Sequence, residues 1–178
     1  AEEVVPPFIR AMQDGYAALM CSPQFLYLKE DSGVLDDYAL ASRLSYFLWS
    51  SMPDQTLMDL AEEGKLRNPA ELDRQVERML RDPKSAAFVR HFPTTWLRMD
   101  KLGKMPPSGG DYQFYKNLRV EPLLMKQVTT YFGDVLARNG RIEEFIDGDY
   151  TFMNQTLAKW IYRREGVRGE RLRKVKLE

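Results

Sequence analysis

The chain has few of the side chains that metal sites and covalent chemistry require. Its 178 residues include one cysteine, Cys21, and one histidine, His91. A single cysteine excludes an intrachain disulfide, and the sequence has no Cys-x-x-Cys-His motif for covalent attachment of a c-type haem. Because the common zinc sites need several cysteine or histidine ligands, we expect no bound metal and no haem in this chain.

Net charge and long apolar runs are also absent. The 26 lysine and arginine residues balance the 26 aspartate and glutamate residues. This balance gives no reason to expect a nucleic acid or an anionic membrane as a partner. The longest uncharged run, residues 15–28, is interrupted by Pro23, whereas a membrane-spanning helix needs about 20 apolar residues. We therefore expect no nucleic-acid partner and no membrane span.

Hydrophobic residues are abundant, at 44% of the chain, and one stretch has the pattern of an amphipathic helix. Within residues 35–50, four apolar side chains have the spacing i, i+4, i+7 and i+8, which places them on one helical face: Leu40, Leu44, Phe47 and Leu48. Asp36 and Asp37 stand where a helix cap and an acidic first turn belong. The pattern predicts a central apolar helix against which other helices pack.

Further helices are indicated by their first residues, because proline is favoured in the first helical turn. Three segments begin in this way, at Pro6-Pro7, Asn68-Pro69 and Asp82-Pro83. Thr151 is expected to cap a last helix, and a short extended piece is expected over residues 172–177. We predict an all-α fold, an irregular multi-helix bundle of six to eight helices around the helix at 35–50.

Two prolines and one loop are expected to interrupt the predicted helices. Pro93 is expected to kink or break its helix, and Pro122 to bend or restart a long helix over residues 114–138. The segment 103–111 contains two prolines and three glycines, which predicts a loop.

The two ends of the chain differ from its middle. We interpret residues 1–30 as the end of a preceding domain or an N-terminal helix, residues 31–165 as the helical core domain, and residues 166–178 as a basic segment leading to a following domain. The apolar helix at 8–20 is expected to form an exposed patch that docks on a neighbour or self-associates. The basic residues after Tyr162 are expected to be a solvated terminus instead of an RNA or phosphate site.

The acidic turn Asp147-Gly148-Asp149 is the best polar constellation. Its paired carboxylates could bind calcium or act as an acid and a base. The alternative interpretation is a turn and helix cap before Thr151, and we favour it.

Three other groups have both a functional and a structural interpretation. Arg43 could anchor an anion or pair with Asp36 or Asp37, and the pair is favoured. His91 could be an axial haem ligand donated to a neighbouring domain, but a partly buried structural histidine is favoured. The tryptophans could form a sugar-stacking platform, but core positions are favoured for all three: Trp49, Trp96 and Trp160.

Four phrases of the sequence occur in a characteristic order: SPQFLY from Ser22, LDDYALASRLSYFLWSSMPD, EGKLRNP with ERMLRDP, and DGDYTFMNQTLA. In this order they resemble a bacterial domain family of unknown function that is abundant in planctomycetes. The resemblance implies a place inside large exported proteins, in the periplasm or at the cell surface, often with a c-type haem domain elsewhere in the polypeptide. It implies no catalytic residues. The sequence departs from the family pattern at Thr95, where a glutamine usually precedes Trp-Leu.

Two hypotheses of function follow. The first is a non-catalytic helical interaction module of a large exported, redox-associated protein, which docks on flanking domains of the same polypeptide or on a protein partner. The alternative is a hydrolytic or polysaccharide-active enzyme domain that uses Asp147 and Asp149, and it requires a cleft with two converging carboxylates. We prefer the first, in which this chain alone is not an enzyme.

Overall fold

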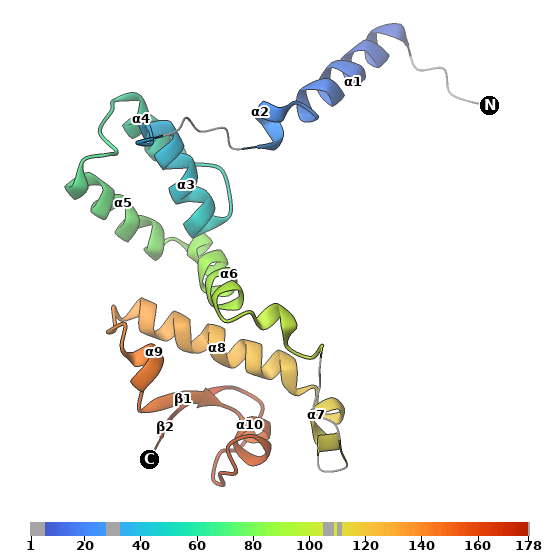
Figure 1. The fold of residues 1–178 in the computed structure, drawn as a ribbon, viewed down its shortest axis with the longest axis vertical. Coiled ribbons are helices and arrows are strands. Elements are labelled where there is room, and N and C mark those ends of the chain that lie inside the picture. The colour runs from blue at the N-terminus through green and yellow to red at the C-terminus, as the bar shows by residue number, and fades with distance from the viewer. Residues whose placement is uncertain (1–5, 28–32, 105–108, 110–111, 178) are drawn as a thin grey trace. The chain divides into compact units, whose positions relative to one another are not determined.

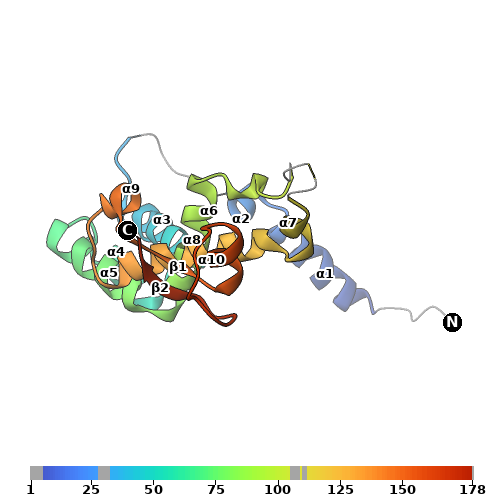
Figure 2. The same cartoon turned by 90° about the horizontal axis from the view of Figure 1, so that it is seen from below.

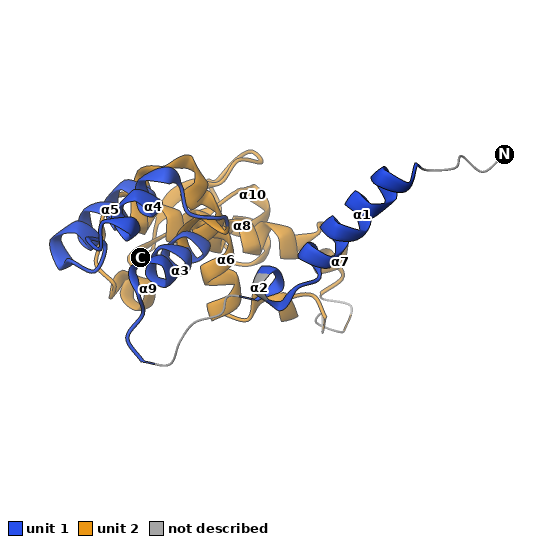
Figure 3. Ribbon diagram, turned by 90° about the horizontal axis from the view of Figure 1, so that it is seen from above, with its two compact units in different colours: residues 1–47, 51–80 blue, residues 48–50, 81–178 orange. Residues whose placement is uncertain are grey.

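The structure is a computed structural model that describes residues 6–27, 33–104, 109 and 112–177. It divides into two compact units, unit 1 with residues 1–47 and 51–80 and unit 2 with residues 48–50 and 81–178 (Figure 3). Parts of two predicted segments lie outside the described residues, namely 1–5 and 28–30 of the N-terminal segment and 105–108 and 110–111 of the loop.

The regular elements in the described part of unit 1 are all helices. Its elements are α1 (Pro7–Met20), α2 (Pro23–Leu26), α3 (Asp37–Trp49), α4 (Gln55–Glu62) and α5 (Pro69–Arg81), with the last residues of α3 and α5 assigned to unit 2.

Unit 2 combines helices with one short sheet (Figure 1). Its elements are η1 (Pro83–Ser85), α6 (Ala86–Trp96), η2 (Met99–Lys101), α7 (Gln113–Asn117), α8 (Val120–Ala137), α9 (Glu144–Asp147), β1 (Tyr150–Met153), α10 (Gln155–Trp160) and β2 (Arg173–Lys176).

The predicted all-α fold class is confirmed. Six of the helices in the described part have eight residues or more, namely α1, α3, α4, α5, α6 and α8. None of the described helices combines the length and the hydropathy that crossing a membrane requires.

The predicted helix starts are confirmed by their caps. Asp36 Oδ1 accepts a hydrogen bond from the amide of Ala39 at 2.7 Å, Asn68 Oδ1 from Ala70 at 3.0 Å and Asp82 Oδ1 from Lys84 at 2.8 Å. Each bond satisfies a donor that the first helical turn leaves without a partner. Pro122 lies in the first turn of α8, where the predicted long helix restarts after the left-handed residue Arg119. Pro93 does not end its helix, because α6 continues through it to Trp96.

The buried face of α3 is not the predicted one. Phe47 is 56% exposed, and the buried residues lie one position further along the helix: Asp37, Ala41, Ser45, Leu48 and Trp49. The reason is a contact distant in sequence. Asp37 is only 4% exposed, and its Oδ2 accepts a hydrogen bond from the amide of Leu66 at 2.8 Å while its Oδ1 is paired with Arg67. This contact sets the rotation of the helix, and the small side chains on the same face fit a close approach.

The segment after the acidic turn forms a strand, so the prediction that Thr151 caps a helix is wrong. Residues 150–153 pair in antiparallel fashion with 173–176, with Tyr150 opposite Lys176 and Met153 opposite Arg173. The cap of α10 is Asn154, whose Oδ1 accepts a hydrogen bond from the amide of Leu157 at 3.0 Å. The extended piece predicted at 172–177 is confirmed as β2.

The core of unit 2 forms where this strand pair meets two helices. Both β1 and α10 pack against α8 (Figure 2). Five buried residues make up the cluster: Tyr115, Val120, Met153, Leu157 and Ala158. The core thereby packs β1 and α10 against the N-terminal half of α8, and the polar network described below lies near the C-terminal end of the same helix.

The helix α1 has the exposed apolar surface that its sequence predicts. Its large apolar side chains have exposed fractions from 42% at Met12 to 72% at Phe8. Docking or self-association through this surface stays a prediction.

Candidate functional site

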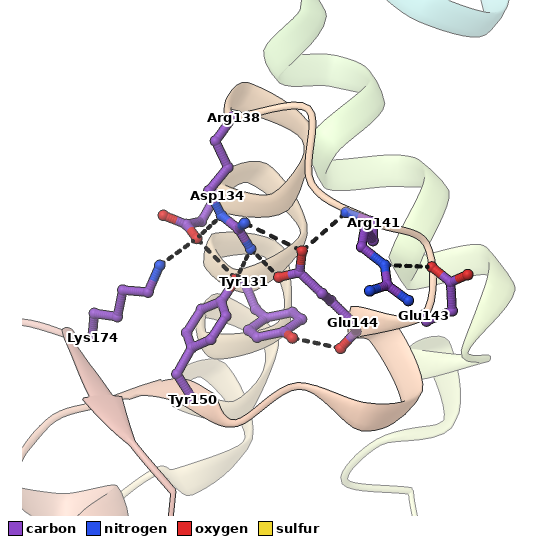
Figure 4. A network of polar contacts seen from close by, with 8 residues as sticks. All are labelled: Tyr131, Asp134, Arg138, Arg141, Glu143, Glu144, Tyr150 and Lys174. Carbon is purple, nitrogen blue, oxygen red and sulfur yellow. Dashed lines mark hydrogen bonds and ion pairs between the residues drawn. The ribbon is translucent and has the colours of Figure 1, made fainter.

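A network of polar contacts joins four elements of unit 2, namely α8, α9, β1 and β2 (Figure 4). Asp134 and Arg138 lie one turn apart near the end of α8, Tyr150 opens β1 and Lys174 lies on β2. Glu144, the first residue of α9, faces Arg138. The strand pairing brings Lys174 to a partner forty residues earlier in the sequence, so the fold assembles this network from distant residues.

Arg138 is the centre of the network. Its Nε donates to Asp134 Oδ2 at 3.0 Å, its Nη1 donates to Glu144 Oε1 at 3.2 Å, and its Nη2 donates to the hydroxyl of Tyr150 at 2.6 Å. Lys174 Nζ donates to Asp134 Oδ2 at 3.0 Å and lies 3.8 Å from the centre of the Tyr150 ring. Two cations therefore face two carboxylates, and the balanced charge gives little attraction for an anionic ligand.

These contacts keep both carboxylates ionised. Burial opposes the charge of Asp134, but hydrogen bonds from Lys174, Arg138 and Tyr150 outweigh burial and lower the pKa of its carboxyl group. The guanidinium of Arg138 and the amide of Arg141 lower the pKa of Glu144. A general acid needs a raised pKa, so these two groups have the wrong shift for proton donation at neutral pH.

Tyr131 connects this network to a pocket. Its hydroxyl donates to the backbone oxygen of Glu144 at 2.6 Å, and burial raises the pKa of Tyr131 to about 12. Gly148 makes room for this hydroxyl, because a Cβ at position 148 would lie 2.0 Å from the Tyr131 oxygen. The φ angle of Gly148 is −76°, which any residue can adopt, so the backbone does not require glycine here. Glycine is required because the Tyr131 hydroxyl occupies the space that a larger side chain would need.

The pocket beside Tyr131 has a volume of about 290 Å³ and lies wholly within unit 2. We call it the aromatic pocket, because six aromatic side chains line it: Trp96, Tyr131, Phe132, Phe145, Tyr150 and Tyr162. Phe132 and Phe145 stack with ring centres 5.4 Å apart, and Trp96 meets Phe145 edge to face at 6.1 Å. Three of the lining side chains are strongly exposed, at 54% for Trp96, 50% for Leu97 and 93% for Ile146, and we call them the rim.

One buried amide lies in the wall of the aromatic pocket. Gln127 is 5% exposed, and its Nε2 donates to the hydroxyls of Tyr162 at 2.8 Å and Thr151 at 3.1 Å. The pocket is therefore apolar over most of its lining, with a small number of polar groups that include Gln127, Thr151 and Glu144, which is the usual composition of a ligand site.

Residues 35–162 match the family described as PSD4, Protein of unknown function (DUF1592). The match covers more than two thirds of the chain. The chain belongs to the PSD4 family. The searches of curated proteins and of solved structures gave no match.

The match contains almost all of the candidate site of this PSD4 domain. The aromatic side chains of the pocket, Gln127 and the centre of the network fall within it. The helices α1 and α2 precede the match, and β2, which carries Lys174, follows it.

The two predicted carboxylates of this PSD4 domain do not face each other across a cleft. Asp147 ends α9 and is exposed, and Asp149 is also exposed, with its Oδ2 3.8 Å from Lys176 Nζ. Gly148 between them lines the aromatic pocket, and neither aspartate is among the described residues that line it. Within the described part of the chain, no group of three or more histidine, cysteine, aspartate or glutamate residues could hold a metal ion.

The other predicted residues lie at separate places. Arg43 is exposed on α3, and the partner of Asp37 is Arg67. His91 is exposed on α6, so the expectation of a partly buried histidine is wrong. The helix turns this residue away from the apolar stripe that contains Phe88.

The tryptophans divide between core and surface. Trp49 is 4% exposed, and Trp160 stacks on Phe114 with ring centres 4.9 Å apart, as expected of packed residues. Trp96 is 54% exposed at the rim, so its assignment to the core is wrong. No other residue of the aromatic pocket or the network was predicted from the sequence to be functional. The many aromatic residues between positions 88 and 162 were the sequence feature that could have indicated the pocket.

Proposed function

We propose that this PSD4 domain is a non-catalytic interaction module of a larger exported, redox-associated protein, and that its binding surface is the aromatic pocket with its rim. The partner in this proposal is a flanking domain of the same polypeptide. The proposed location is the periplasm or the cell surface. A c-type haem, where the full-length protein carries one, belongs to another domain.

The observation that carries the proposal is the exposed rim of the pocket. Trp96, Leu97 and Ile146 are half or more exposed beside a concave aromatic surface. Protein interfaces are enriched in aromatic anchors that enter pockets, and they exclude charge from their centre. The charged network lies next to this surface, and its cations are paired with its carboxylates. A polar rim of this kind commonly surrounds the apolar centre of an interface.

The surroundings of the carboxylates support the non-catalytic part of the proposal. Asp134 and Glu144 are held by cations that lower their pKa values. Asp147 and Asp149 are exposed at the surface of a turn. A glycosidase needs one carboxyl group with a raised pKa opposite a second carboxylate, and no feature of these four residues favours that arrangement. The exported and redox-associated context rests on the resemblance of the four sequence phrases alone.

Photo-crosslinking in the full-length polypeptide tests the proposal. A photoreactive phenylalanine analogue replaces Ile146 at the rim, and in a matched control it replaces Lys116, which is exposed on α7. We expect position 146 to crosslink to a second domain of the same polypeptide and position 116 to do so much less. Equal yields at both positions, or no crosslink between domains from position 146, would contradict the proposal. A visible absorption spectrum of the same sample reports whether the polypeptide contains haem.

A further inference from the structure

Among the polar groups that line the aromatic pocket, the buried amide of Gln127 indicates what the pocket recognises. Both amide hydrogens of Gln127 are engaged, one with Thr151 and one with Tyr162. A glutamine amide has two donor hydrogens and one acceptor oxygen. The structure gives Oε1 no hydrogen-bond partner among the described residues, so this oxygen is the acceptor that the site offers to a ligand.

The position of Gln127 makes this acceptor selective. The side chain as a whole is 5% exposed, and Oε1 is not among the fully buried atoms without a partner in the described part of the chain, so this oxygen keeps a small accessible surface. A ligand that fills the pocket would remove water from this acceptor, which is costly unless the ligand supplies a donor in its place. A ligand of the same shape without a donor would leave this oxygen unpaired and should therefore bind with lower affinity.

The size and the walls of the pocket limit the rest of the ligand. A dry cavity of about 150 Å³ accommodates one benzene molecule, so a pocket of about 290 Å³ has room for one substituted ring or one fused pair of rings. Aromatic rings stack or meet edge to face. The pair of Phe132 and Phe145 and the edge contact of Trp96 offer both geometries.

We infer that the aromatic pocket binds one aromatic ring that carries a hydrogen-bond donor, the phenol of tyrosine or the indole of tryptophan, on a segment of the partner domain. The hydroxyl or the indole N–H donates to Oε1 of Gln127, and the ring packs against the aromatic lining that includes Trp96 and Phe145. This inference rests on the proposed function for the source of the ring, while the selectivity for a donor follows from the pocket alone.

Binding of side-chain analogues to the full 178-residue chain tests the inference. The probes are p-cresol and toluene, which have the side-chain structures of tyrosine and phenylalanine, and binding is followed by tryptophan fluorescence and by the chemical shift of the Gln127 amide. We expect p-cresol to bind about tenfold more tightly, because one satisfied buried acceptor has roughly that effect on affinity. Equal affinities, or no binding of either probe at millimolar concentration, would overturn the inference.

Two variants separate recognition from packing. Gln127→Met keeps the length of the side chain and removes the acceptor, so the preference for p-cresol over toluene is expected to disappear. Phe145→Leu removes part of the aromatic wall, so both probes are expected to bind more weakly while their ratio is kept. Circular dichroism shows whether each variant is folded. If Gln127→Met does not fold, the ratio measured with the unaltered chain and with Phe145→Leu still decides the question.

A last pair of probes identifies the source of the ring. The blocked peptides Gly-Gly-Tyr-Gly-Gly and Gly-Gly-Phe-Gly-Gly are titrated in the same way. Preference for the tyrosine peptide supports a side chain of a partner, whereas selective binding of p-cresol without binding of the peptide overturns that part and assigns the site to a free phenol. Selective probe binding without crosslinks from position 146 contradicts the proposed function, and crosslinks without probe selectivity contradict only the inference.

Discussion

The two units of this domain are stabilised by different kinds of contact. Unit 1 depends on side chains that bind backbone amides, and its most buried charge, Asp37, accepts the amide of Leu66. A second long-range contact in unit 1 is the pair of Arg78 with Asp54, at 2.7 and 3.2 Å. Unit 2 depends on aromatic rings and on hydroxyl groups that connect α8 to β1. The aromatic pocket accompanies contacts of the second kind, so the proposed binding surface lies in unit 2.

The largest effect is expected from emptying a core site. Leu57 of unit 1 and Leu157 of unit 2 are each 0% exposed. Leu57→Ala and Leu157→Ala should each lower the free energy of unfolding by about 2–5 kcal/mol, the usual range for a packed leucine. Leu44→Ala is the control, because Leu44 is half-buried and should cost less. Urea unfolding measures all three, and an equal cost for Leu44 would show that the observed face of α3 is wrong.

The next largest effect is confined to unit 2. Gly148→Ala places a methyl group 2.0 Å from the Tyr131 hydroxyl and 2.7 Å from the Glu144 backbone oxygen. We expect a loss of about 1–3 kcal/mol, as for other overpacked sites, together with a weaker contact between Tyr131 and α9. Gly15→Ala is the matched control, since nothing lies within 4 Å of its added methyl group in α1. Thermal unfolding of both variants checks the prediction, and an equal response would show that Tyr131 moves freely.

The corresponding test of unit 1 is Asp37→Asn. The substitution keeps one acceptor oxygen for the amide of Leu66 and removes the charge that faces Arg67. We expect a loss of about 1–2 kcal/mol, in the range for a hydrogen bond to a charged group. Hydrogen exchange at the amide of Leu66 should become faster. Unchanged exchange would mean that this carboxylate does not set the rotation of α3.

The smallest effect is expected from alkaline pH, and it involves unit 2. Burial raises the pKa of Tyr131 from its ordinary value of 10.0 to about 12. A raised pKa stabilises the folded state fully below the ordinary value, and this contribution is lost as the pH rises from 10 towards 12. Tyr131→Phe should therefore flatten the decline of stability in this range. The absorbance of tyrosinate measures the pKa, and urea unfolding at the same pH values measures the stability. A decline of stability that is unchanged in Tyr131→Phe would contradict the prediction.

Acid pH should also lower the stability of unit 2, through its carboxylates. The lowered pKa values of Asp134 and Glu144 stabilise the folded state above the ordinary values of 3.8 and 4.5. This contribution is lost as the pH falls below those values. Replacing Lys174 with methionine removes one donor to Asp134, so the pKa of Asp134 in the folded state should rise towards 3.8 and less stability should be lost as the pH falls than in the unaltered chain. Unfolding midpoints measured at decreasing pH test this, and coincident curves would contradict it.

The sequence was informative where structure is local. The caps at Asp36, Asn68 and Asp82 are each recognised from residues two or three positions apart, and all were predicted correctly. The rotation of α3 was not predicted, because it depends on a contact between Asp37 and Leu66, 29 positions later. A prediction from hydrophobic spacing also gives most weight to large apolar side chains. It therefore did not identify a buried face that contains Ala41 and Ser45.

The candidate site was almost invisible in the sequence for the same reason. Gln127 meets Tyr162 across 35 positions, and Lys174 meets Asp134 across 40. A lone glutamine or lysine in a helix or strand carries no signal of such a partner. The acidic turn was noticed for its carboxylates, whereas its structural importance lies in Gly148.

The pairing of β1 with β2 has a consequence for how this domain can be divided. The family match ends at residue 162, yet β2 at 173–176 supplies the hydrogen-bonding partner of β1. A polypeptide cut at the end of the match would leave the amides and carbonyls of β1 as an open edge, which invites pairing with other molecules. It would also lose Lys174 from the face of Tyr150. The smallest piece that folds cleanly therefore extends at least to Leu177, beyond the region by which relatives are recognised.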